Sequence, residues 1–174
     1  MDGGGALMNQ SIHIVDMLLY LNGDPAEVFA YAATATHDIE VEDNLIAVIR
    51  YKNGSMGTLE VSTSCAPGFP RKLEFTGSKG SVILEEDDFI RWTFDEKLPD
   101  DDQISLASSV ESAGGSDPSQ IRSDGHTAQI RDLAEAILQK RPPRLDGVEG
   151  RRAVALICGI YESARTGKPF VFGE

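Results

Sequence analysis

Apolar residues recur at helical spacing in three segments of the chain. The first covers residues 6–21 and is apolar nearly all round, which is typical of a helix buried inside a protein. The other two cover residues 126–139 and 147–166, close to the end of the chain. We therefore predict one helix before the strands and two after them. Each is followed by a stop signal, namely Asn22-Gly23, Pro142-Pro143 and Gly167.

Alternating and β-branched sequence predicts strands between the first helix and the last two. Asn53-Gly54 lies between two apolar runs and predicts a tight hairpin, because both central residues of that turn take positive φ. Hairpins that follow one another build an antiparallel sheet. The sequence thus predicts an α+β fold, with a large, open, mostly antiparallel sheet and helices on one face. The expected strands cover residues 28–36, 44–51, 56–63, 72–76, 81–84 and 89–94, and residues 169–172 form an extended tail.

The sheet face that the helices leave open is either solvated or covered by another subunit. Few charges interrupt the strand sequences, which favours an oligomer interface. We therefore expect a homo-oligomer that forms through this face. Residues 95–123 are rich in Asp, Ser and Gly and predict a flexible loop with little to bury. Residues 1–174 together are expected to form a single substrate-binding and oligomerisation domain.

The charge of the chain narrows the classes of partner. Its 174 residues carry a formal net charge of −12, which repels nucleic-acid phosphates and anionic lipids. No apolar stretch approaches the ~20 residues of a membrane span, and no signal peptide opens the chain. We expect a cytoplasmic protein that binds neither nucleic acid nor membrane.

The first helix carries the candidate chemistry. Its polar residues Asn9, His13, Asp16 and Tyr20 follow the spacing i, i+4, i+7, i+11, which places them on one helical face. Hydrogen-bonding groups on a buried helix must meet polar partners, because burying them unpaired is costly. A stripe without Lys, Arg or Glu is more typical of a pocket wall than of a solvated face. The alternative is a structural pair between His13 and Asp16.

The glycines before this helix invite a nucleotide-binding interpretation. Gly3 and Gly5 resemble the beginning of a dinucleotide fingerprint. However, Met8 stands at the third glycine position and no strand precedes the motif. We expect no cofactor phosphate here, and glycines that allow a close backbone approach or a sharp bend.

Outside the first helix, few residues are candidate ligands. Cys65 and Cys158 lack the Cys or His neighbours of a metal site, so we expect no metal and two reduced, partly buried thiols, with a disulfide as the alternative. His126 opens the second predicted helix and is either a pocket residue or a surface histidine. His37 beside Asp38 is expected to be structural or solvated.

The order of motifs resembles a known family. Residues 3–16, GGGALMNQSIHIVD, resemble the GGG-x-L-x-D/N-x-G-x-H-x-x-D segment of the glucose–fructose oxidoreductase, inositol dehydrogenase and rhizopine-catabolism (Gfo/Idh/MocA) family. The chain departs from that pattern at Ser11, where the family usually has glycine. Further segments resemble the family in the same order, namely Glu42-Asp43 and residues 53–57, 67–70, 77–81, 146–152 and 161–169.

This resemblance is to the C-terminal domain of the family. It implies an upstream Rossmann domain, absent from this chain, that binds NAD or NADP, so this chain alone would bind no cofactor and be inactive. The implied reaction removes hydride from a secondary alcohol of a sugar, polyol or cyclitol, the expected small-molecule partner. The alternative function is a non-catalytic ligand-binding or oligomerisation module left by truncation.

The resemblance also implies roles for individual residues. His13 matches the catalytic histidine, whose pKa in isolation is about 6.5 and suits a base at neutral pH. Asn9 stands where most members have the aspartate that orients this histidine. Asp16 matches an acidic position that accepts sugar hydroxyls. The expected substrate-binding residues are Asp16, Gln10, Tyr20 and His126.

Overall fold

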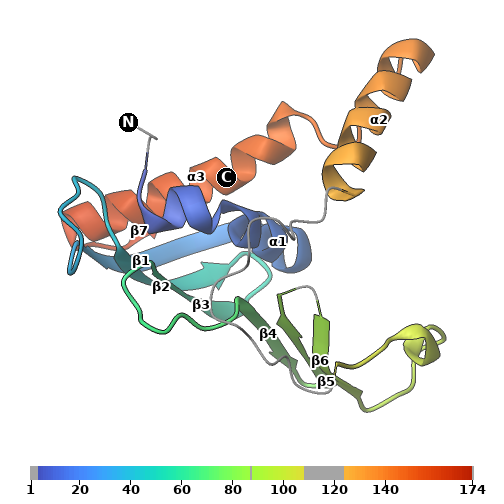
Figure 1. The fold of residues 1–174 in the computed structure, drawn as a ribbon, viewed down its shortest axis with the longest axis horizontal. Coiled ribbons are helices and arrows are strands. Elements are labelled where there is room, and N and C mark those ends of the chain that lie inside the picture. Colours follow the sequence, from blue (N-terminus) through green and yellow to red (C-terminus); the bar gives the residue numbers. More distant parts are fainter. Residues whose placement is uncertain (1–3, 87, 108–123, 174) are drawn as a thin grey trace. The chain divides into compact units, whose positions relative to one another are not determined.

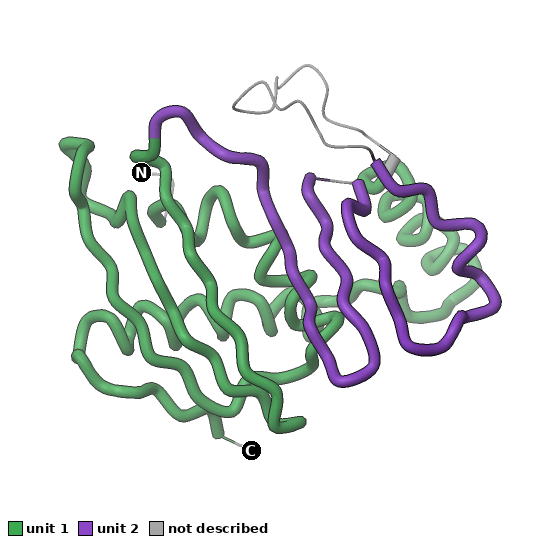
Figure 2. Tube along the Cα trace, turned by 90° about the horizontal axis from the view of Figure 1, so that it is seen from below, with its two compact units in different colours: residues 1–65, 123–174 green, residues 66–122 purple. Residues whose placement is uncertain are grey.

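The computed structural model of the chain describes residues 4–86, 88–107 and 124–173. The chain divides into two compact units. Unit 1 comprises residues 1–65 and 123–174, and unit 2 comprises residues 66–122 (Figure 2).

Unit 1 is built on a four-stranded antiparallel sheet. Its strand order is β3-β2-β1-β7, so the strand nearest the C-terminus pairs with the first one. The predicted hairpin between β2 and β3 is confirmed. Its turn differs from the expectation, because Gly54 takes positive φ, at 89°, and Asn53 does not. The strands are β1 (Pro25–Ala33), β2 (Asn44–Tyr51), β3 (Met56–Ser62) and β7 (Phe170–Val171).

Helices cover one face of this sheet (Figure 1). A π-helical turn, η1 (Ala6–Gln10), leads into α1 (Ile12–Asn22), and α3 (Gly147–Thr166) packs beside α1 and against β1. Alternate strand residues face these helices, as expected for a sheet with one covered face. The core so formed contains Val15, Leu19, Val28, Ala30, Leu45, Ala47, Ile49, Leu59, Val61, Leu156, Ile157 and Ile160.

Both ends of α3 are capped by the residues that the sequence signals. The Asp146 carboxylate accepts hydrogen bonds from the Val148 and Glu149 amides at 2.8 and 3.1 Å. Gly167 takes the left-handed conformation, φ 64°, that ends many helices. Helix α2 (Asp124–Gln139) precedes α3 in the same unit.

Unit 2 contains a three-stranded antiparallel sheet with the order β4-β5-β6. Trp92 packs edge-on against Phe89 and Phe94, with ring centroids 5.0 and 5.2 Å apart. Its indole donates a 2.7 Å hydrogen bond to Asp101, which lowers the pKa of that carboxyl below its usual range. The elements are β4 (Lys72–Gly77), β5 (Gly80–Glu85), β6 (Asp88–Phe94) and the 3₁₀ turn η2 (Asp101–Gln103).

The α+β class is confirmed, with a finer division than one large sheet. The described strands form two sheets, because residues 63–71 between β3 and β4 include Pro67 and Pro70, which cannot donate ladder hydrogen bonds. Within the loop predicted for residues 95–123, residues 95–107 contain η2, and residues 108–123 lie outside the described residues.

The two cysteines and the lengths of the helices can also be compared with the sequence predictions. Cys65 and Cys158 are both free and exposed, so the expected partial burial was wrong; Cys158 lies on the side of α3 away from the core. In the part of the chain that the structure describes, no helix combines the length and apolar character needed to cross a membrane.

Candidate functional site

The predicted polar stripe is divided between two helical elements. Asn9 lies in the π-helical turn η1, whereas His13, Asp16 and Tyr20 lie on α1. The two elements meet at Ser11, which is helical in neither. Because a π-turn winds differently from an α-helix, the spacing that aligns Asn9 with His13 does not hold across this junction. Only the last three residues of the stripe keep the α-helical register.

The stripe is exposed in this chain. Asn9, His13 and Asp16 are all solvent-accessible, and Tyr20 is 82% exposed. Gln10, the other residue predicted to bind substrate in this segment, is exposed as well. The described contacts of His13 and Asp16 include no hydrogen bond between them, so the structure gives no support to a structural pair. Helix α1 buries only its opposite side, through Val15 and Leu19.

Partly buried polar contacts fix the start of the segment. The Glu42 carboxylate accepts hydrogen bonds from the Leu7 amide at 2.9 Å and from the Tyr161 hydroxyl at 3.0 Å. The same hydroxyl accepts from the Met8 amide at 3.2 Å. Burial, and then the Glu42 carboxylate, raise the pKa of Tyr161 to about 12, so the phenol stays protonated and able to donate.

The approach of Gly5 to Glu42 explains one of the three glycines. A Cβ at Gly5 would collide with the carboxylate and the backbone oxygen of Glu42. The same contact also bears on whether this turn can bind the phosphates of a nucleotide cofactor. With a carboxylate already bound to the Leu7 amide, this N-terminus would repel the phosphates of NAD or NADP. The residues of η1 therefore do not fit the cofactor, and Gly3 lies outside the described residues.

Arg152 of α3 fixes the other end of α1. Its guanidinium donates to the Leu19 carbonyl at 3.3 Å, and it forms ion pairs with Asp24 at 2.9 Å and Glu149 at 2.8 Å. These acidic partners raise the pKa of Arg152 further, Glu149 most of all. Helix α3 thus contacts both ends of the segment that carries the stripe.

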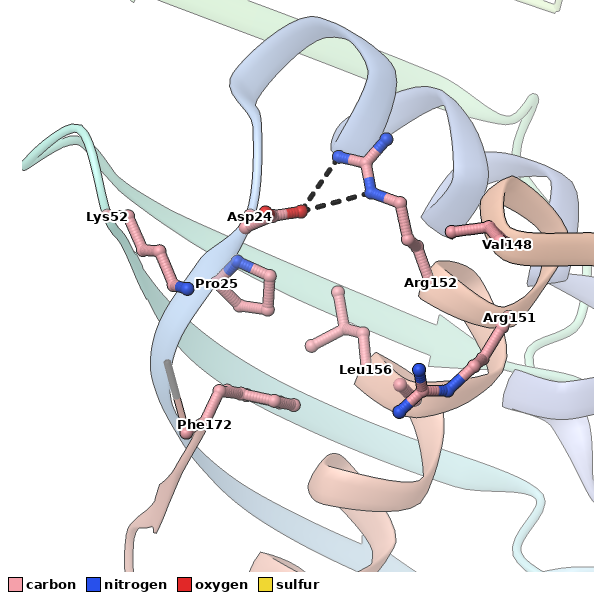
Figure 3. A pocket seen from close by; sticks show the side chains of 10 residues that line it. Asp24, Pro25, Lys52, Val148, Arg151, Arg152, Leu156 and Phe172 are labelled. Atoms are coloured by element: carbon pink, nitrogen blue, oxygen red, sulfur yellow. Dashed lines mark hydrogen bonds and ion pairs between the residues drawn. The ribbon is translucent and has the colours of Figure 1, made fainter.

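A cavity of about 270 Å³ lies beside this ion pair. Figure 3 shows Arg152 reaching Asp24, with Lys52 and Arg151 at the rim and Pro25 and Phe172 below. None of the stripe residues lines this cavity. A second cavity, of about 460 Å³, lies in unit 2 around Trp92 and Phe94. These two cavities, as lined by the described residues, are therefore separate from the residues that carry the candidate chemistry.

His37, expected to be structural or solvated, contacts a buried carboxylate. Its Nδ1 lies 3.1 Å from the buried carboxylate of Asp43. Asp43 also accepts the amides of Ala35, Thr36 and His37 at 2.7, 2.8 and 3.0 Å. Hydrogen bonds from the amides of Ala35 and His37, then Thr36, hold the pKa of Asp43 well below its usual range. His126, by contrast, is exposed in the first turn of α2.

Comparison with known proteins identifies the family. Residues 1–83 match the model of the GFO/IDH/MocA C-terminal domain. Nearly half of the chain thus matches the Gfo/Idh/MocA family. An 87-residue stretch, 47% of the chain, is 28% identical to the Myo-inositol 2-dehydrogenase of Thermotoga maritima and covers 26% of that protein. A stretch of the same length is 30% identical to the uncharacterised oxidoreductase YrbE of Bacillus subtilis.

Solved structures extend the Gfo/Idh/MocA likeness to nearly the whole chain. The WlbA dehydrogenase from Bordetella pertussis, in complex with NADH and UDP-GlcNAcA, is 31% identical with a TM-score of 0.83. The match covers 98% of this chain and 47% of that one. Levoglucosan dehydrogenase, at 21% identity and a TM-score of 0.74, shares the fold. This chain thus spans about half the length of its solved relatives.

Neither Glu42 nor Tyr161 is predicted from the sequence to have a role in this region. Both lie within segments that resemble the family, but their meeting joins positions 119 residues apart. A local signal exists for each. Glu42 lies in a polar stretch two residues before β2, and Tyr161 is a polar-tipped aromatic beside Ile157 and Ile160 on the apolar face of α3.

Proposed function

We propose that this chain is the substrate-side part of an NAD(P)-dependent dehydrogenase that acts on a secondary alcohol of a sugar, polyol or cyclitol. The observation that carries the proposal is the exposed helix face with His13, Asp16 and Tyr20, on a domain of the Gfo/Idh/MocA family. Two relatives support the substrate class. One is named for myo-inositol, and another was solved with a UDP-sugar and NADH.

His13 takes the proton of the reacting hydroxyl in this proposal. A neutral imidazole can accept a proton at neutral pH, and an exposed ring on a fixed helix can reach a substrate that docks on α1. Asp16, Gln10 and Tyr20 accept or donate hydrogen bonds to the remaining hydroxyls. Asn9, on the neighbouring turn, orients the imidazole or the substrate through hydrogen bonds without adding charge.

The exposure of the stripe supports a site completed by another part of the protein. A binding pocket buries most of a small ligand's surface, whereas the stripe in this chain faces solvent. The cofactor belongs to that other part, because η1 does not fit its phosphates. His126 is proposed as a further substrate contact, reached from the first turn of α2.

The test expresses this chain together with the coding sequence that precedes it. His13→Ala and His13→Gln are each expected to lower kcat with a polyol substrate about 100-fold or more, because neither side chain can accept the proton. Leu21→Ala is the matched control, since Leu21 is exposed on the same helix without a hydrogen-bonding group. Full turnover in both His13 variants would refute the assigned role.

The chain by itself is expected to bind neither NAD(H) nor NADP(H). Calorimetric titration of residues 1–174 with each nucleotide measures this directly. Saturable binding with one nucleotide per chain would contradict the assignment of the cofactor to another part of the protein.

We also propose that the open sheet face mediates homo-oligomerisation. This face carries exposed apolar residues on all four strands of the sheet, and the helices cover only the opposite face. Exposure of that area in a monomer would be unfavourable. The apolar residues of the open face are Phe29, Tyr31, Ile46, Val48, Met56 and Val171.

A further inference from the structure

We propose that Glu42 and Tyr161 are positioning residues that set the place of the helix carrying His13. This inference rests on the proposed function, because it assigns the pair a role in the same site. Neither residue belongs to the stripe, and each acts through the backbone of η1.

Glu42 holds the first turn from the side of the sheet. Its backbone oxygen accepts the Ala6 amide at 3.0 Å, and its carboxylate accepts the Leu7 amide at 2.9 Å. Helix-starting amides have no partner within their own helix, so an outside acceptor fixes where the helix begins. Glu42 immediately precedes Asp43, whose buried carboxylate anchors the same stretch of chain.

Tyr161 holds the same turn from the side of α3. Its hydroxyl donates to Glu42 at 3.0 Å and accepts from the Met8 amide at 3.2 Å, so one atom joins the loop before β2, α3 and η1. The ring packs against the core, which restricts its movement. Ala6 and Leu7 of the turn also pack in the core, and the phenol adds a directional polar contact between α3, Glu42 and this turn.

Gly5 makes this close approach possible. A side chain at this position would occupy the space of the Glu42 carboxylate and carbonyl. The glycine is buried and lies two residues before the amide that the carboxylate binds. A requirement for glycine at this position thus follows from the Glu42 contact.

Backbone hydrogen bonds connect the turn η1 directly to α1, so the position of the turn fixes the position of the helix. The Leu7 carbonyl accepts the Ser11 amide at 3.2 Å, and the Ser11 carbonyl accepts the Val15 amide at 3.0 Å. His13 lies between these two contacts. The remaining packing of α1 against the core is apolar, and apolar contacts are non-directional. Polar anchors at η1 and at Arg152 therefore determine where along its axis the helix rests.

Hydrogen exchange on residues 1–174 tests the anchor independently of catalysis. Tyr161→Phe removes the hydroxyl and keeps the ring, and we expect the protection of the Met8 amide to fall about tenfold. The Ala30 amide, which donates to Ser163 of α3, is the internal control and should keep its protection. Unchanged protection at Met8 would overturn the anchor.

Kinetics of the chain joined to its preceding sequence test the positioning role. Tyr161→Phe and Glu42→Ala are expected to lower kcat about 10- to 100-fold while KM for the nucleotide stays unchanged. Glu42→Gln, which keeps an acceptor oxygen, should recover part of the loss. Glu40→Gln is the matched control, because Glu40 is exposed in the same loop and loses the same charge.

The outcomes separate this inference from the proposed function. If His13→Ala abolishes turnover but Tyr161→Phe leaves kcat unchanged, the positioning role is wrong and the proposed function stands. If His13→Ala keeps full turnover, the proposed function fails and the positioning role fails with it, whatever the exchange at Met8. A loss of kcat in Tyr161→Phe with an equal rise in nucleotide KM would also overturn the role.

Discussion

A single buried carboxylate, Asp43, orders the connection between β1 and β2. It accepts three consecutive backbone amides and lies 3.1 Å from the imidazole of His37. These hydrogen bonds favour the charged form, so the folded-state pKa lies below the unfolded value of about 3.9. A depressed carboxyl pKa contributes stability that is fully present above the unfolded pKa and is lost as the pH falls through the folded pKa.

Asp43→Asn should therefore destabilise the protein at pH 7. The difference in unfolding free energy between the native chain and the variant is expected to shrink as the pH falls from about 4 towards 2, where Asp43 approaches protonation. Urea unfolding across this range, followed by circular dichroism, measures it. A difference that stays constant with pH would show that the carboxylate charge contributes nothing.

For single residues, the sequence predicts the kind of role better than it predicts the contact partner. His37 is expected to be structural or solvated, and its contact with Asp43 makes it structural. The sequence does not indicate Asp43 as its partner. The true partner depends on a loop that folds back over six residues, which no periodicity expresses.

Helix α3 is the element that organises unit 1. It contributes core residues, holds both ends of the η1–α1 segment and packs against β7. Two of its glycines have opposite surroundings. Gly150 is exposed with open space around it, whereas a Cβ at Gly159 would come within 2.6 and 2.8 Å of the Phe172 and Phe170 rings.

These surroundings predict opposite effects of one substitution. Gly150→Ala should stabilise the protein by roughly 0.5–1 kcal/mol, because alanine restricts the unfolded chain and favours the helix. Gly159→Ala should destabilise it by about 1–3 kcal/mol, since the aromatic pair beside β7 must move. Denaturant unfolding of both variants measures the signs. Equal effects would contradict the packing of the C-terminal strand on α3.

Elements with a strong local pattern are predicted well. The last helix is predicted for residues 147–166 and found at Gly147–Thr166, because its capping residues and periodicity lie in one segment. The break at Ser11 and the short strand β7 are not predicted. The first accompanies contacts with Glu42 and Tyr161, and the second pairs with β1 across the chain, so both depend on distant residues.

Within unit 1, the sheet face opposite the helices carries no helix. Tyr31 and Ile46 are cross-strand partners on this face and are 69% and 55% exposed, and Val48 beside them is 52% exposed. One ion pair, between Glu27 and Arg50, crosses the same face. The predicted homo-oligomer follows from this surface, which the alternating strand pattern places opposite the core.

Val48→Glu should dissociate that oligomer by placing a charge within its apolar centre. Sedimentation velocity of the native chain is expected to show an oligomer, and the variant a monomer. Leu145→Glu is the control, because Leu145 is 59% exposed in the connection between α2 and α3. A native chain that sediments as a monomer at every concentration would rule the interface out.

The proposed role of His13 as the base of a dehydrogenase concerns the chemical step, which single-turnover kinetics measures without product release. The chain is joined to its preceding coding sequence, loaded with oxidised nicotinamide cofactor and mixed with myo-inositol or a UDP-sugar, and reduced cofactor is followed by absorbance. We expect rapid reduction of the cofactor in the protein with His13, and a rate lower by about 100-fold or more in His13→Ala. Equal rates in the two proteins would contradict it.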